Sequence, residues 1–278
     1  MHRGSSLAGD AFLRRVYPPI TLPRWVPTKT HRAEREAVET LDRIVYELID
    51  RGTAQGRKSH VLSMFLSVVD EETGEGMSRH QLRDELITIF LAGHDTINAA
   101  FTWFFYLLAG HPDVQEKIRV EIVEVAPDKI MKPSQYRELR YTEVAFNEAL
   151  RIYPVIPVLA RTSIRDVLLG DYVVASNSIV LCPIYGLHRS PRYWDCPEEY
   201  RPERFLMQEN GYNYRFIPFV GVPRKCIGDR LAMAEAMIII SKVLEVCRLE
   251  RMSGFVPKPH TIITMMSQNG MRLRVRGL

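Results

Sequence analysis

The sequence predicts a mainly α-helical protein with a minor β component, and three observations support this fold class. Apolar residues recur at helical spacing in several stretches, most clearly over residues 31–51. A second helical pattern, from Ser78 to Gly110, is long enough to form the spine of a core. Between residues 157 and 181, by contrast, short β-rich runs alternate with Gly, Asp and Asn turns, which is typical of a small sheet.

The expected helices begin after a proline-rich opening. The first spans about His31–Arg51 and ends before Gly52, because glycine is a common helix stop. A shorter helix is expected over His60–Val69. Ser78 and Gln81 have the spacing of a capping box, in which each side chain accepts a hydrogen bond from the other residue's backbone N–H. This box is expected to begin the long spine helix.

The spine helix is expected to end near Gly110, because Pro112 cannot continue it and instead begins the next helix. The β-rich part then holds three short runs: Val158–Thr162, Leu168–Val174 and Ser178–Leu181. Helix returns over about Asp229–Val246. The last residues predict a hairpin in which Thr261–Met265 pairs with Met271–Val275.

Composition excludes several classes of protein. With 278 residues, 46% of them hydrophobic and 25% charged, the chain has a soluble globular composition. A net charge of +4 is small for this length, so no nucleic-acid partner is expected. The longest apolar stretch, Leu86–Leu108, contains Asp95, which costs roughly 2.5–3.5 kcal/mol near the centre of a membrane span. We therefore expect a buried helix there and no transmembrane segment.

The cysteines indicate a reducing compartment. The chain has four, and they form neither a Cys-x-x-Cys pair nor a spacing with histidines that predicts zinc. No disulfide framework is indicated, and no apolar run of signal-peptide length precedes residue 31. A cytoplasmic location is therefore expected.

Cys226 carries the most informative chemistry. It lies in Phe216-Ile-Pro-Phe-Val-Gly-Val-Pro-Arg-Lys-Cys-Ile-Gly228, directly before an expected helix. Arg224, Lys225 and the helix N-terminus favour the thiolate, because a positive potential stabilises negative charge on sulfur. A thiolate can ligate a metal or attack an electrophile, and this local chemistry leaves both open. A cysteine nucleophile would need a histidine with a suitable partner, and none is evident. The simplest alternative is a buried cysteine with no chemical role.

Two further patterns lie on expected helices. Ala92-Gly-His-Asp-Thr96 places a glycine, an acid and a hydroxyl in the apolar spine, where the helix could open to admit a ligand or water. The alternative is a polar helix face paired elsewhere. Glu148 and Arg151 stand three residues apart and share a helix face, which in isolation indicates an ordinary ion pair worth roughly 0–1 kcal/mol.

Taken in order, these patterns resemble the cytochrome P-450 superfamily. The family's four motifs are matched by Gly93-x-Asp-Thr96, Glu148-x-x-Arg151, Pro202-Glu-Arg-Phe205 and the Cys226 loop. The resemblance covers roughly Ser78–Leu278. It implies the C-terminal part of the cytochrome P-450 fold, with a long central helix, small sheets and a haem-ligand loop before a helix. Residues 1–278 are expected to form a single truncated domain that lacks the family's N-terminal part, with every motif in 78–278.

The resemblance also implies a haem site. Cys226 would be the axial ligand of the iron of haem b, and its thiolate would donate electron density that favours O–O cleavage. Phe219 would pack against the ligand loop, which Gly228 completes. Arg224 and Arg161 would each reach a haem propionate.

Further residues gain roles from the same resemblance. Asp95 and Thr96 would organise proton delivery to dioxygen. Glu148, Arg151 and Arg204 would form a network with bidentate geometry that a lysine could not reproduce, and that holds the core under the haem. His188 is assigned no ligand role, since a lone histidine in a loop is usually structural.

The loop departs from the family at two positions. Val222 stands where the family nearly always has glycine, and Val220 stands where small residues are usual. Glycine permits positive φ and close approach to the porphyrin, which a β-branched residue resists. The resemblance implies a monooxygenase that inserts one atom of O2 into a small, apolar organic substrate, with electrons from a ferredoxin, a flavodoxin or a reductase. The alternative is a non-catalytic, truncated remnant with impaired haem binding.

Overall fold

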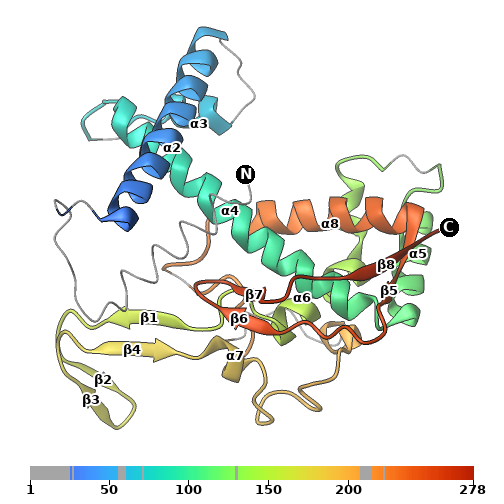
Figure 1. The fold of residues 1–278 in the computed structure, drawn as a ribbon. Coiled ribbons are helices and arrows are strands. Elements are labelled where there is room, and N and C mark those ends of the chain that lie inside the picture. Colours follow the sequence, from blue (N-terminus) through green and yellow to red (C-terminus); the bar gives the residue numbers. More distant parts are fainter. Residues whose placement is uncertain are drawn as a thin grey trace. The chain divides into compact units, whose positions relative to one another are not determined.

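The computed structural model describes residues 26, 28–55, 61–70, 72–128, 131–206, 214–221 and 223–278. The chain divides into two compact parts, residues 1–95 and 96–278. Helices dominate both, and every strand among the described residues lies in the second part (Figure 1). The mainly α-helical class with minor β is confirmed. The expectation of a single domain stays a prediction.

The first part contains the helices expected from the apolar spacing. Helix α2 spans Lys29–Gln55 and α3 spans Val61–Ser67, so both helices are confirmed. The predicted stop before Gly52 is wrong, because α2 continues through this glycine to Gln55. Val45 and Ile49 of α2 are buried against Leu82, because these side chains share the apolar faces of their helices.

The capping box at the start of the spine helix is confirmed. The N–H of Ser78 donates to Oε1 of Gln81 at 2.9 Å, and the N–H of Gln81 donates to Oγ of Ser78 at 3.2 Å. Helix α4 then runs over Arg79–Leu108 without interruption, so the expected opening of the helix at Gly93 is not seen. A Cβ at that glycine would meet nothing within 4 Å. In the part of the chain that the structure describes, neither α4 nor any other helix has the length and apolarity to span a membrane.

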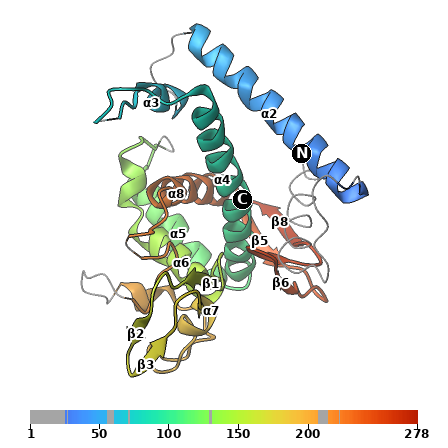
Figure 2. The same ribbon diagram turned by 90° about the vertical axis from the view of Figure 1, so that its left-hand side faces the viewer.

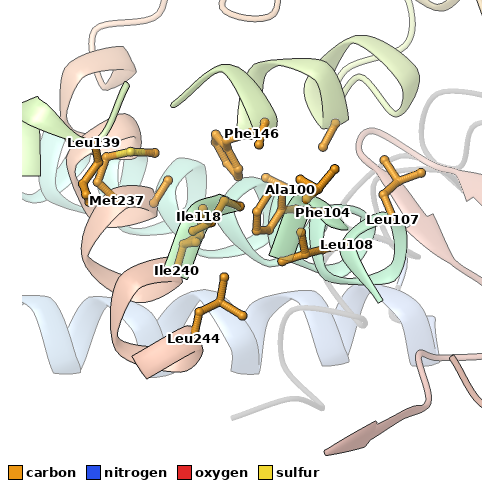
Figure 3. Packing of buried hydrophobic residues seen from close by; sticks show 14 of the residues in the cluster. Ala100, Phe104, Leu107, Leu108, Ile118, Leu139, Phe146, Met237, Ile240 and Leu244 are labelled. Carbon is orange, nitrogen blue, oxygen red and sulfur yellow. The ribbon is translucent and has the colours of Figure 1, made fainter. Parts of the chain in front are cut away.

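The core of the second part is a packed set of helices. The C-terminal half of α4 meets α5 (Pro112–Val125), α6 (Arg140–Ile152) and α8 (Asp229–Val246) in one apolar cluster. Figure 3 shows side chains from these four helices directed at one another, and the most deeply buried include Phe104, Leu108, Ile118, Phe146, Ile240 and Leu244. Pro112 begins α5 as expected. A single turn, η1 (Gln135–Glu138), precedes α6.

Two small antiparallel sheets form the β-rich part (Figure 2). Strand β1 (Leu159–Thr162) pairs with β4 (Ile179–Cys182). Strands β2 (Val167–Leu169) and β3 (Tyr172–Val174) form a hairpin, whose turn needs the positive φ of +61° that Gly170 adopts. The predicted runs Val158–Thr162 and Ser178–Leu181 are confirmed as β1 and β4, whereas the single run predicted over Leu168–Val174 is two strands joined by this turn. Two short helices follow, α7 (Ile184–Leu187) and η2 (Pro202–Phe205).

The predicted C-terminal hairpin is wrong. Strand β6 (Pro259–Thr261) pairs with β7 (Met265–Ser267), whereas β8 (Leu273–Gly277) pairs with β5 (Cys247–Arg251). Exposed ion pairs add modestly to the β5–β8 pairing, since Nε of Arg276 on β8 lies 3.3 Å from Oε1 of Glu250 on β5.

Strand β5 was not expected from the sequence, and it is fixed by polar side chains of α5. Gln115 accepts from the N–H of Leu249 at 3.0 Å, and Arg119 donates to the carbonyl of Cys247 at 2.6 Å. Cys247 and Leu249 are also buried against Ala109. This pairing therefore depends on contacts distant in the sequence.

Candidate functional site

The loop before α8 presents Cys226 at the surface. Cys226 is a free thiol and is exposed. Its backbone N–H donates to the carbonyl of Phe219 at 2.9 Å, which closes the loop upon itself. Gly228 is the N-cap of α8, and its carbonyl accepts from the N–H of Ala232 at 2.9 Å. The helix start and the internal hydrogen bond therefore fix the backbone on both sides of the sulfur.

Phe219 and Gly228 lie where they can shape this loop. Phe219 is half-buried and packs against the apolar core of the second part, so it ties the loop to the helices. A Cβ built on Gly228 would lie 3.9 Å from Sγ of Cys226, which is an ordinary van der Waals contact. The structure therefore brings Phe219, Cys226 and Gly228 together.

Lys225 was expected to add positive potential at the Cys226 thiol, but its charge is partly neutralised by an ion pair. Lys225 is ion-paired with Asp229 on the first turn of α8, and this ammonium holds the pKa of the Asp229 carboxyl below its ordinary value. Lys225 therefore contributes less positive potential than a free cation would. The i,i+4 spacing of opposite charges was the signal that could have predicted this pair.

The two arginines expected to reach propionates are exposed. Arg224 follows the turn of the loop, and Arg161 lies on β1, where its Nη1 donates to the carbonyl of Ala160 at 2.8 Å. Within the described ranges, neither guanidinium has a carboxylate within ion-pair distance. Both are therefore available to an anion.

The backbone at Val220 is strained. Its φ is +64°, in the left-handed region that a β-branched residue rarely adopts. Glycine would adopt this backbone conformation without steric strain. Val222, the second departure from the family pattern, lies outside the described residues.

The donor set around Cys226 fits a haem better than a bare metal ion. Among the residues that the structure describes, no group of three or more His, Cys, Asp or Glu side chains could hold a metal. A porphyrin supplies four nitrogen ligands itself and needs one thiolate from the protein. Ile227, next to the thiol, is 94% exposed, as suits contact with an apolar ligand. Cys226 would hold the iron, and the guanidiniums of Arg224 and Arg161, which have no carboxylate partner among the described residues, suit the propionates.

Asp95 and Thr96 are consecutive residues of α4. The Asp95 carboxylate lies 2.9 Å from Nδ1 of His94, with roughly half of each side chain exposed. His94 in turn stacks on Phe90. Thr96 is half-buried. The relation of these two residues to Cys226 stays a prediction.

The structure brings Glu148, Arg151 and Arg204 together in a buried network. Nε of Arg151 donates to Oε2 of Glu148 at 2.8 Å, and its Nη2 donates to Oε1 at 2.9 Å, so the pair is bidentate. Nε of Arg204 donates to Oε1 at 2.9 Å. The side chains of Glu148 and Arg151 are fully buried, and 8% of Arg204 is exposed. Arg151 thus has the bidentate geometry toward Glu148 that the resemblance implied, and Arg204 adds a single hydrogen bond.

The two arginines of this network also bind backbone carbonyls of the segment between α7 and η2. Nη1 of Arg151 donates to the carbonyls of His188 at 2.8 Å and Pro197 at 2.7 Å. Nη1 of Arg204 donates to the carbonyl of Asp195 at 2.9 Å. Arg151 also lies over the ring of Trp194, at 5.1 Å from the centroid. The network therefore holds a stretch of chain that has little regular structure.

The sequence predicted no ligand role for His188, but it gave no indication of its contact with the Cys226 loop. The residue is fully buried, and its Nε2 lies 3.0 Å from the backbone N–H of Ile217, near the start of the Cys226 loop. Its place directly after a short helix gave no signal of this contact.

An exposed thiol on a closed loop before a helix, with a helical core that holds a buried carboxylate and two guanidiniums, is an arrangement that suits the haem-thiolate class of protein. Residues 5–273 match the family model described as Cytochrome P450. The chain belongs to the cytochrome P450 family.

Relatives among curated proteins agree. The chain is 37% identical over 209 residues to "Protein LUTEIN DEFICIENT 5, chloroplastic" of Arabidopsis thaliana, covering 73% of this chain and 35% of that protein. It is 32% identical over 254 residues to "Carotene epsilon-monooxygenase, chloroplastic" of the same organism, covering 87% and 46%. It is 36% identical over 200 residues to human "Cytochrome P450 4V2", covering 70% and 38%. The chain thus spans less than half the length of these relatives.

Proposed function

We propose that this chain carries the thiolate side of a haem b monooxygenase, which inserts one atom of O2 into a small, apolar organic substrate. The observation that carries the proposal is the exposed Cys226 thiol on a loop closed by its own backbone, directly before α8. When bound, the haem would supply the activation of dioxygen. Electrons would come from a ferredoxin, a flavodoxin or a reductase.

Residues of this chain would have separate tasks. Cys226 would bind as the thiolate, and Arg224 and Arg161 would bind propionates, since guanidiniums match carboxylates in geometry and charge. Glu148, Arg151 and Arg204 would keep the core below the haem in place.

Asp95 and Thr96 would handle protons. Oδ1 of Asp95 can exchange a proton with Nδ1 of His94 at 2.9 Å, and 45% of the His94 side chain is exposed to solvent. This supports a proton path from solvent to Asp95. The hydroxyl of Thr96, the next residue, would donate a hydrogen bond at the reacting oxygen.

The substrate class and the compartment are inferred more indirectly. One relative is named for carotene, a hydrocarbon, which supports an apolar substrate. All four cysteines are free, which supports a reducing compartment such as the cytoplasm.

A spectrum tests the haem ligand. The purified chain is mixed with haem, reduced and exposed to carbon monoxide, and we expect the strongly red-shifted Soret band of thiolate ligation. Cys226→Ser should lose this band, because a hydroxyl is a poor substitute for the thiolate. Cys196→Ser, the matched control at another exposed free cysteine, should keep it. A band that survives in Cys226→Ser would contradict the proposal.

The alternative is a non-catalytic chain with impaired haem binding. The strained φ of +64° at Val220 favours it, because the ligand loop must hold an unfavourable conformation. Failure of the unmodified chain to take up haem and give the thiolate band would support this alternative.

A further inference from the structure

His188 is a buried polar residue that the proposed haem site does not use. It follows α7, and its exposed fraction is 0%. Burying a polar side chain costs free energy unless it makes hydrogen bonds, so the hydrogen bonds of His188 are expected to contribute to the stability of the fold.

The backbone and the ring of His188 contact different segments of the chain. Its backbone carbonyl accepts a hydrogen bond from Nη1 of Arg151 at 2.8 Å. Its Nε2 lies 3.0 Å from the backbone nitrogen of Ile217, whose N–H can only donate. One residue therefore joins the Glu148–Arg151–Arg204 network to the start of the loop that carries Cys226.

The ring must be neutral for this contact. Because Nε2 accepts a hydrogen bond from the Ile217 N–H, the ring hydrogen lies on Nδ1. Burial first, and the positive charges of Arg151 and Arg189, lower the pKa of His188 to about 4, while the carbonyls of Leu150 and Arg151 oppose this. Nδ1 has no hydrogen-bond partner of ordinary geometry among the described residues. The acceptor at Nε2 is thus available throughout the neutral range of pH.

The hydrogen bond to Ile217 differs from those within the loop. The N–H groups of Val220, Arg224 and Cys226 donate to carbonyls of the loop itself, at 3.1, 3.1 and 2.9 Å. The Ile217 N–H instead reaches across to His188, which is 29 residues away in the sequence. The internal bonds fix the shape of the loop, whereas this one fixes where it begins.

We propose that His188 is a positioning residue, which holds the Cys226 loop at a fixed place relative to the Glu148–Arg151 network through the Ile217 N–H to Nε2 hydrogen bond. The significance for Cys226 rests on the proposed function, since a displaced loop would present the thiolate poorly to haem. The ring of Phe216, 5.3 Å from that of His188, packs beside this hydrogen bond.

Two substitutions separate the hydrogen bond from simple packing. His188→Gln keeps an acceptor, because Oε1 of glutamine can occupy the place of Nε2. His188→Phe keeps a ring of similar volume and removes the acceptor. If His188 only fills space, the phenylalanine variant should be the milder one.

Amide hydrogen exchange of the full chain without haem measures the protection of the Ile217 N–H at the start of the Cys226 loop. In His188→Phe we expect the Ile217 amide to exchange about tenfold faster, the factor for losing roughly one hydrogen bond. In His188→Gln it should stay within about threefold of the parent. The Leu249 amide, bonded to Gln115 at 3.0 Å in the β5 region, is the internal control and should not change in either variant.

A second readout concerns the thiolate. The fraction of the reduced carbon monoxide complex with the red-shifted Soret band should fall in His188→Phe and recover in His188→Gln. Unchanged Ile217 exchange in His188→Phe, or equal acceleration at Leu249, overturns the inference. Loss of Ile217 protection in His188→Gln with Leu249 intact overturns it too. A parent chain without the thiolate band would instead refute the proposed function, and the exchange comparison would still decide the role of His188.

Discussion

Glu148→Gln should destabilise the protein strongly, because it removes the one carboxylate between two buried guanidiniums. Glutamine has nearly the same shape, so the change deletes charge with little loss of volume. Arg151 is fully buried and Arg204 is 8% exposed, so neither guanidinium can turn to water. The amide NH2 of glutamine would also face an N–H of an arginine, donor against donor.

The magnitude follows from these contacts. Breaking a buried ion pair by removing one partner costs roughly 3–5 kcal/mol, because an uncompensated charge stays buried. Arg151 would keep its hydrogen bonds to the carbonyls of His188 and Pro197, which soften the loss. We therefore expect the lower end, about 3 kcal/mol. This is a large part of the roughly 5–15 kcal/mol by which a folded domain is stable.

Urea denaturation followed by tryptophan fluorescence measures this loss. Trp194 is a suitable probe, since its ring lies 5.1 Å from the guanidinium of Arg151. Glu250→Gln is the matched control, because Glu250 is 47% exposed and its ion pair with Arg276 should be worth roughly 0–1 kcal/mol. If Glu148→Gln costs no more than this control, the account of the network is refuted.

The remaining predictions concern the loop, the buried histidine and the spine. Val220→Gly should stabilise the chain by about 0.5–1 kcal/mol in urea denaturation, because relief of the positive φ exceeds the entropic cost of glycine. Val275→Gly, in the extended strand β8, should instead lower the free energy of unfolding. If Val220→Gly also lowers it, the backbone at Val220 is not strained. Stability should fall by about 2 kcal/mol between pH 7 and pH 5, because the His188 ring takes up a proton below pH 6.5 when unfolded and only near its lowered pKa of about 4 when folded. Denaturation of His188→Gln at both pH values should lack this component, and an equal fall there would contradict the assignment. Thr96→Ala should lower the ratio of product formed to electrons consumed, whereas Thr88→Ala, exposed on the same helix, should leave it unchanged. An unaltered ratio in Thr96→Ala would argue against its role.

Local signals predicted the helices well. The capping box of Ser78 and Gln81 and the proline at residue 112 are short-range features, and the structure has both helix starts where they indicate. The β5–β8 pairing was missed because it depends on partners far apart in the sequence. Gln115 on α5 binds Leu249 across 134 residues, and no local pattern reports such a contact.

The contacts of the candidate site also fall into those that local spacing predicts and those that depend on distant segments of the chain. The spacing of Glu148 and Arg151 could be read as one helix face, but their complete burial depends on the surrounding fold. The interaction of Lys225 with Asp229 could have been predicted from i,i+4 spacing. The bond from Ile217 to His188 could not, since it joins a backbone group to a side chain in another segment.

The carbonyls held by Arg151 and Arg204 have a consequence for local unfolding. The segment from His188 to Glu199 has only short turn hydrogen bonds of its own, such as that from the Trp194 N–H to the Ser190 carbonyl. Several of its carbonyls also accept hydrogen bonds from the side chains of Arg151 and Arg204, which lie outside it. Its free energy of opening is therefore set in large part by two guanidiniums. This segment should release as one unit, so that weakening the network would open a single protease-sensitive region while the helical core stays closed.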